Sequence, residues 1–206
     1  MVHPSIQNLI FDLGGVILNL HVDRTHAAFA RLANQKVEDV RTRIERTGFF
    51  NDYEKGLISD ADFRNRVREF LSIANSDAEI DHAWNAMLGD IPAERLQLLT
   101  RLRKNYRVFL LSNTNQIHLD CFGKIVYSAS GKTSLDPFFE KTYYSHLMKM
   151  RKPEPEIFEY VLNTNKLDPQ STLFLDDNTS NLTGAASIGI QTFHVKDPSL
   201  VLPLFS

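Results

Sequence analysis

A short apolar stretch near the N-terminus ends in one carboxylate and is followed at once by two glycines. Residues 9–15 read LIFDLGG. The apolar run predicts a strand over residues 6–12 that is central in a parallel sheet, because such strands are buried on both faces. An aspartate at the strand end, followed by backbone that needs glycine's freedom, outlines a phosphate or metal site around Asp12. The same pattern also fits an ordinary strand that ends in a turn.

Further apolar runs alternate with helical patterns along the second half of the chain. Strands are expected at 6–12, 107–112, 141–144, 172–176 and 190–195. Helices are expected from Pro92 to about Asn105, from about Pro155 to Leu162, and before Gly189. This alternation predicts an α/β fold, a doubly wound, Rossmann-like parallel sheet of about five strands. Residues 128–132, SASGK, suggest a loop.

Residues 19–89 contain helical patterns and no convincing strand. Ser59 and Ser76 are placed to begin helices, and Ile80, Trp84 and Leu88 recur at helical spacing. The block is too long for a crossover between two strands. We therefore expect a catalytic core made of residues 1–18 and 90–206, with residues 19–89 inserted as an all-helical cap.

The composition excludes several classes of protein. A formal net charge of -2 over 206 residues argues against a dedicated nucleic-acid or anionic-membrane surface. No apolar run approaches the ~18 residues of a spanning helix, and the start lacks a signal-peptide pattern. A single cysteine, Cys121, cannot form an internal disulfide. These features predict a cytoplasmic protein, a monomer or a homodimer, whose partner is a small molecule rather than a nucleic acid or a membrane.

Polar residues stand where the chain is expected to leave the sheet. In an open parallel sheet, ligands bind outside the carboxyl ends of the strands. The residues at or near these ends are Asp12, Ser112, Asn113, Lys152, Asp176 and Asp177. Taken singly, Ser112-Asn113 could begin a helix and Lys152 could be a solvated loop lysine. Two adjacent acids at a buried edge repel each other, and a cation is the common remedy.

Together these segments resemble the four motifs of the haloacid dehalogenase superfamily. The matching stretches are FDLGGV from residue 11, LLSNTN from 110, RKPEPEIF from 151 and FLDDNTSN from 174. The resemblance covers essentially the whole chain, including a helical C1-type cap after the first motif. It is closest to small bacterial sugar-phosphate phosphatases of the glucose-1-phosphate type, and the phosphatase domain of soluble epoxide hydrolases is also similar.

The resemblance implies a Mg²⁺-dependent phosphatase. A metal ion between a carboxylate nucleophile and an anionic phosphate neutralises both. Asp12 would attack phosphorus, form an aspartyl-phosphate and ligate Mg²⁺, with the Gly14 carbonyl as a second ligand. Asp177 would ligate the metal directly, and Asp176 would do so through water or hold the surrounding shell.

The resemblance also implies a phosphate-binding set. Ser112 would donate its hydroxyl to the phosphate, helped by backbone N–H groups at the following helix start near Asn113. Lys152 would neutralise charge on Asp12 and on the transferring group. Asn181, one helical turn after Asp177, would support the metal shell.

Gly14 departs from the usual pattern of this superfamily. Most of its phosphatases carry a second aspartate at this position, which protonates the leaving oxygen and then activates water. Each step is typically helped ~10²–10⁴-fold by such a group. Three explanations remain: a substrate with a good leaving group, such as an aldose 1-phosphate; a proton donor from elsewhere, such as His21; or a catalytically weak or inactive protein.

The cap is expected to select the substrate, because it closes over the site. Tyr53 and Glu54 could form an aromatic and acidic wall suited to a sugar, whereas Phe49 and Phe50 are better explained by helix packing. The leading hypothesis is hydrolysis of a sugar phosphate. The alternative is a metal-independent 2-haloacid dehalogenase, against which the Asp176-Asp177 pair argues, since two acids without a metal would repel a carboxylate substrate.

Overall fold

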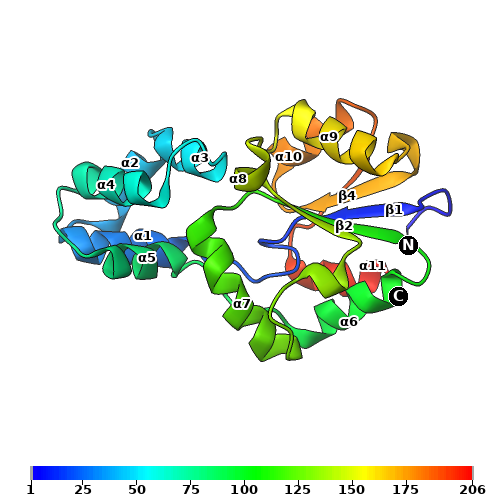
Figure 1. Ribbon diagram of the computed structural model, residues 1–206, viewed down its shortest axis with the longest axis horizontal. Coiled ribbons are helices and arrows are strands. Elements are labelled where there is room, and N and C mark those ends of the chain that lie inside the picture. The colour runs from blue at the N-terminus through cyan, green and yellow to red at the C-terminus, as the bar shows by residue number, and fades with distance from the viewer. Residues whose placement is uncertain (1, 206) are drawn as a thin grey trace.

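The computed structural model describes residues 2–205, and its centre is a five-stranded parallel sheet (Figure 1). The strand order is β3-β2-β1-β4-β5. The strands are β1 (Asn8–Phe11), β2 (Arg107–Ser112), β3 (Lys141–Tyr144), β4 (Thr172–Asp176) and β5 (Gln191–His194). Every pair of neighbours is parallel. The predicted fold class is confirmed.

Helices cover both faces of the sheet (Figure 1). Alternate residues of each strand face opposite layers. Along β1, Phe11 packs with α6 (Ala93–Leu102), α7 (Gln116–Ser130) and α11 (Val201–Leu204). Its neighbour Ile10 packs on the other side with α9 (Pro155–Asn165) and α10 (Thr179–Ala186). The short α8 (Ser145–Met148) follows β3. The sheet is therefore buried on both sides, as the apolar strands require.

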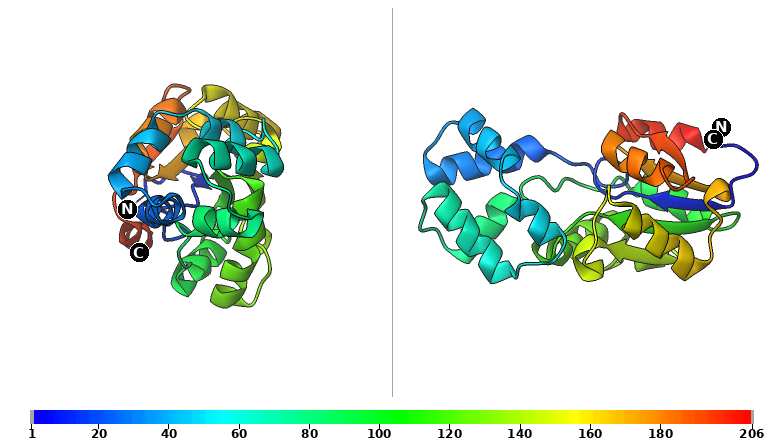
Figure 2. Two further views of the ribbon diagram at one scale, coloured as in Figure 1. Left: turned by 90° about the vertical axis from the view of Figure 1, so that its left-hand side faces the viewer. Right: turned by 90° about the horizontal axis from the view of Figure 1, so that it is seen from above.

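Five helices lie between β1 and α6, and they gather beyond the carboxyl ends of the strands (Figures 1 and 2). They are α1 (Val22–Ala33), α2 (Val37–Glu45), α3 (Phe49–Glu54), α4 (Asp60–Leu71) and α5 (Asp77–Asn85). Their own apolar core includes Phe29, Phe63 and Trp84, and Ile117 of α7 packs into it. That residues 19–89 act as a cap over a core of 1–18 and 90–206 stays our proposal.

The two connections to these helices run side by side. The Asn19 N–H donates to the Asp90 carbonyl at 2.9 Å, and the His21 N–H donates to the Met87 carbonyl at 2.8 Å. Leu20 and Leu88 form an antiparallel bridge between the two connections. The chain therefore leaves and re-enters the sheet half at one place.

One expected loop is helical. Residues 128–130 of the SASGK stretch belong to α7, and the helix ends only at Gly131, which has a φ of 70°. The Ser128 and Ser130 hydroxyls donate to the carbonyls four residues earlier, so these small polar residues are accommodated within the helix. Conversely, the helix after Pro92 ends at Leu102 rather than near Asn105. None of the helices within residues 2–205 combines the length and apolar character that membrane crossing requires.

Candidate active site

Three carboxylates meet at the carboxyl edge of β1 and β4. Phe11 is paired with Leu175 in the ladder, so Asp12 and Asp176 leave neighbouring strands at the same level. An oxygen from each of Asp12, Asp176 and Asp177 lies within 4.8 Å of the others. Asp12 and Asp176 are buried, whereas Asp177 is exposed.

A buried lysine ties two of these acids together. Lys152 Nζ lies 2.7 Å from Asp12 Oδ1 and 2.7 Å from Asp176 Oδ2. The side chain is 1% exposed, and its ammonium group sits 5.2 Å from the centre of the Phe174 ring. A buried ammonium between two carboxylates is stable because both partners compensate its lost hydration.

The acids outnumber the cation. Burial raises the pKa of Asp12, and the opposing effect of Lys152 does not cancel it. Partial desolvation also raises the pKa of Asp177, whose side chain remains partly exposed, and neighbouring Asp176 adds to the rise. Burial alone would lower the pKa of Lys152, but the two carboxylates raise it, so the side chain stays charged. Three carboxylates beside one ammonium leave excess negative charge, and oxygen donors of this kind suit Mg²⁺.

Asp176 is held by several donors at once. Its Oδ1 accepts from the Asn178 N–H at 2.7 Å, and Asn181 Nδ2 lies 3.2 Å from Oδ1 and 3.0 Å from Oδ2. Together with Lys152, these contacts occupy both oxygens of Asp176. The geometry favours Asp176 as a residue that orients the others, with Asp12 and Asp177 left to face a metal ion. Asn181, which the sequence predicts to support a metal shell, contacts Asp176 through its amide, and its role toward a metal stays a prediction.

Gly15 lets Asp177 approach the end of β1. Its φ is 72°, and an added Cβ would lie 2.3 Å from Asp177 Oδ2. No other residue type fits there without displacing that carboxylate. Gly14 has a different neighbour: an added Cβ would lie 3.2 Å from Leu20 Cδ2. An apolar side chain therefore packs beside Gly14, the position at which the family resemblance leads us to expect a second aspartate.

Ser112 and Asn113 follow β2 but do different things. Ser112 is buried, and within residues 2–205 its hydroxyl makes one long contact of 3.5 Å, to the Asn113 carbonyl, so it stays free to donate to a ligand. Asn113 was predicted to bind substrate. It lines the cavity described below, and its side-chain amide donates to the Lys152 carbonyl and accepts from the Lys152 N–H, both at 2.9 Å. Asn113 thus positions the lysine loop. The helix begins later, with Asn115 accepting from the His118 N–H.

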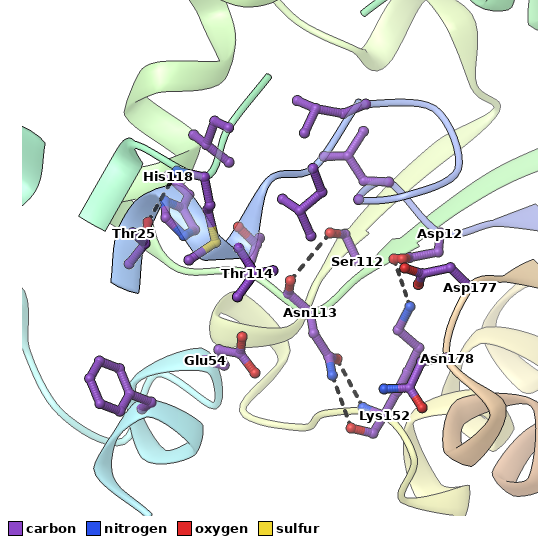
Figure 3. A pocket seen from close by; sticks show the side chains of 18 of the residues that line it. Asp12, Thr25, Glu54, Ser112, Asn113, Thr114, His118, Lys152, Asp177 and Asn178 are labelled. Carbon is purple, nitrogen blue, oxygen red and sulfur yellow. Dashed lines mark hydrogen bonds and ion pairs between the residues drawn. The ribbon is translucent and has the colours of Figure 1, made fainter. Parts of the chain in front are cut away.

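A cavity of about 610 Å³ joins this edge to the helices beyond it (Figure 3). Asp12, Ser112, Lys152 and Asp177 line one side. Glu54 from α3 lines the other, as predicted, and pairs with Arg151, whose Nη2 lies 2.8 Å from Glu54 Oε2.

Two predicted residues lie elsewhere. Tyr53 is buried in the helical layer, stacked on Phe63, and its hydroxyl donates to Asp60 Oδ1 at 2.7 Å, so it does not form the cavity wall. A helical pattern cannot tell which of two adjacent residues faces a ligand. His21 lines a separate cavity with Arg95 and Asp177, so it does not face Asp12 across the main cavity.

Sequence reasoning missed several further residues of the cavity wall. Among them are Thr25, His118 and Arg151. Arg151 directly precedes Lys152 in the third motif, which could have suggested a role in the site. His118 lies in the first turn of α7 and gave no signal, because its partner Asn85 is far away in the sequence.

The chain matches the haloacid dehalogenase-like hydrolase family over residues 6–189. A D-ribitol-5-phosphate phosphatase from Bacteroides thetaiotaomicron is 32% identical over 191 residues, which cover 91% of each chain. The crystal structure of a family enzyme from the same organism, in complex with magnesium and inorganic phosphate, aligns with a TM-score of 0.83. It is 42% identical and covers 92% of this chain and 93% of its own. A predicted HAD-like family hydrolase from Porphyromonas gingivalis aligns with a TM-score of 0.85 at 30% identity, covering 98% and 99%. The protein therefore belongs to the haloacid dehalogenase-like hydrolases.

Proposed function

We propose that this hydrolase is a Mg²⁺-dependent phosphatase that cleaves the phosphate monoester of a small sugar or sugar alcohol. The observation that carries this proposal is the group of Asp12, Asp176 and Asp177 around the buried Lys152. Such an arrangement suits an anionic substrate only when a cation offsets the acids. The relatives named above, a sugar-alcohol phosphatase and an enzyme crystallised with magnesium and phosphate, support the same conclusion.

Asp12 is the proposed nucleophile. Lys152 holds its Oδ1 at 2.7 Å, and among residues 2–205 no donor occupies Oδ2, which leaves that oxygen to attack phosphorus and form an aspartyl-phosphate. The Ser112 hydroxyl is placed to donate to a phosphate oxygen at the end of β2. Mg²⁺, held by Asp12, Asp177 and the Gly14 carbonyl, would neutralise the carboxylates and the phosphate so that the anions can meet.

Two candidate substrates differ in the basicity of the oxygen that leaves when the phosphate ester is cleaved. No side chain at Gly14 can protonate a departing oxygen, which favours a weakly basic one, such as the anomeric oxygen of an aldose 1-phosphate. The relative's name instead points to a terminal sugar-alcohol phosphate, D-ribitol 5-phosphate. Both carry hydroxyls next to a phosphate ester, and both are proposed for the same cavity.

A screen of phosphate esters with and without Mg²⁺ tests the function. We expect hydrolysis of aldose 1-phosphates or of D-ribitol 5-phosphate that is lost on chelation. The Asp12→Asn variant should remain folded and inactive. Acid-quenched mass spectrometry of the wild type should show a phosphoryl adduct on Asp12.

The same screen distinguishes the alternatives. Release of halide from a 2-chloroalkanoate without metal would instead show a dehalogenase. Undiminished activity in Asp12→Asn would show that Asp12 is not the nucleophile. Absence of any hydrolysis by the wild type would indicate an inactive protein.

A further inference from the structure

We propose that His118 accepts a hydrogen bond from a hydroxyl of the substrate through its Nε2 atom, and so selects hydroxylated phosphate esters over plain alkyl ones. This inference rests on the proposed phosphatase function and deepens it. His118 lies in the first turn of α7 and lines the cavity. Figure 3 shows it beside Thr25, on the far side of the cavity from Asp12 and Asp177, where the non-phosphate part of a substrate would lie.

The ring is fixed from two directions. Its Nδ1 lies 2.7 Å from Asn85 Oδ1, at the end of α5. Its face stacks on Trp84, with ring centres 4.8 Å apart and an angle of 13° between the planes. Asn115 holds both His118 and Trp84 in place, because its Oδ1 accepts from the His118 N–H and from Trp84 Nε1. The ring therefore needs no rearrangement when a ligand arrives.

These contacts determine what Nε2 can do. An amide oxygen only accepts hydrogen bonds, so the partner of Asn85 Oδ1 must be a protonated Nδ1. Burial lowers the pKa of His118 to about 3, so the imidazole is neutral near neutral pH. Nε2 then carries a lone pair. Within residues 2–205 nothing hydrogen-bonds to Nε2. Unlike both nitrogens of His146, it is not one of the fully buried polar atoms without a partner, so a ligand in the cavity can reach it.

The surroundings favour a hydroxyl as the partner. Thr25 is already engaged, since its hydroxyl donates to the Trp84 carbonyl at 2.9 Å and accepts from the Met87 N–H at 3.1 Å. Val22, Met87 and Trp84 contribute apolar lining, which suits the C–H groups of a carbon chain. A neutral acceptor in such a wall attracts a hydroxyl, which can donate, and gives nothing to an alkyl chain.

The test compares two phosphate esters of similar length. One is the hydroxylated ester that the wild type cleaves best, chosen from D-ribitol 5-phosphate and an aldose 1-phosphate, and the other is n-pentyl phosphate. His118→Phe keeps an aromatic ring against Trp84 but removes both ring nitrogens, that is, Nε2 and the Nδ1 contact with Asn85. We expect kcat/KM for the hydroxylated ester to fall roughly 10- to 100-fold, mostly through KM, and the loss with pentyl phosphate to be at least about fivefold smaller.

Two further variants separate recognition from folding. His118→Gln can offer an amide oxygen near the position of Nε2 and should recover part of the lost selectivity. His146→Phe is the matched control, because His146 is also buried but does not line the main cavity, and it should keep the wild-type ratio between the two esters.

Three results would overturn the inference. The first is equal loss on both esters in His118→Phe, which would place the ring in the chemical step or in folding. The second is a wild type that does not prefer the hydroxylated ester although it cleaves both. If the wild type cleaves neither, the phosphatase proposal itself fails, and the role of His118 fails with it.

Discussion

The two sides of the cavity are built differently. At the sheet edge, the side chains are charged and bonded to one another, with Lys152 at 2.7 Å from both Asp12 and Asp176. On the opposite side, the contacts join the helices of residues 19–89 to the sheet half: Asn85 to His118 at 2.7 Å and Glu54 to Arg151 at 2.8 Å. The reactive side is thus organised within the sheet half, by strand ends, the Lys152 loop and α10. The recognition side exists only while the helices are seated on it.

The largest effect is expected from removing the cation at the sheet edge. Lys152→Met leaves two buried carboxylates without their partner, so the free energy of unfolding should fall by about 3 kcal/mol or more. Phosphatase activity should fall by roughly 10³-fold, because no ammonium offsets charge on the transferring group. Denaturant titration and steady-state kinetics measure the two. Lys124→Met, at an exposed lysine, is the control. Activity close to wild type in Lys152→Met would show that the sheet edge does not depend on Lys152.

A smaller effect at the same edge is expected from Gly15→Ala. The added Cβ would meet Asp177 Oδ2 at 2.3 Å, and the positive φ disfavours alanine. We expect roughly 10- to 100-fold weaker Mg²⁺ activation, measured as the metal concentration that gives half-maximal activity. Gly48→Ala is the matched control, because an added Cβ there meets no atom within 4 Å. Unchanged Mg²⁺ dependence in Gly15→Ala would show that Asp177 is not a ligand of the metal ion.

On the recognition side, His118 should make folding sensitive to acid. Its pKa falls from 6.5 to about 3 in the folded protein, so the unfolded chain binds the proton more readily between these values. The free energy of unfolding should therefore decrease as the pH falls, with His118 contributing about 2–3 kcal/mol of that decrease between about pH 7 and pH 4.5. Urea titrations of the wild type and of His118→Gln measure it. The variant should lose less stability, and parallel curves would contradict the prediction.

The smallest effect is expected from Glu54→Gln, which removes the acid that pairs with Arg151 in the cavity wall. Stability should change by less than about 1 kcal/mol, since both side chains are partly exposed. The unpaired guanidinium should improve kcat/KM for a sugar bisphosphate relative to a monophosphate by about two- to fivefold. Glu154→Gln is the control, because it breaks the neighbouring pair with Lys55 outside the cavity. The same gain in both variants would mean that the effect arises from how the helices of residues 19–89 attach to the sheet half, and not from the charge in the cavity wall.

The sequence predicted the sheet edge better than the cavity wall, for a physical reason. Parallel strands deliver their carboxyl ends to one edge, so apolar runs that end in Asp12 and Asp176 are sufficient to bring these residues together. The pairing of Asn113 with the Lys152 backbone joins segments 39 residues apart, and no local pattern encodes it. His118 and Asn85 are 33 residues apart and meet only because α5 rests on α7. Tyr53 failed as a prediction because its ring turns into the helical layer.

The paired connections at residues 19–21 and 87–90 make the helical insertion equivalent to a very large hairpin loop. Because Asn19 and Asp90 are hydrogen-bonded across the junction, the chain enters and leaves the insertion through two adjacent segments held a strand spacing apart. A tight turn of about two residues could span the same gap. The sheet edge can therefore keep its geometry whichever set of helices is placed above it, which allows one reactive centre to serve many substrates.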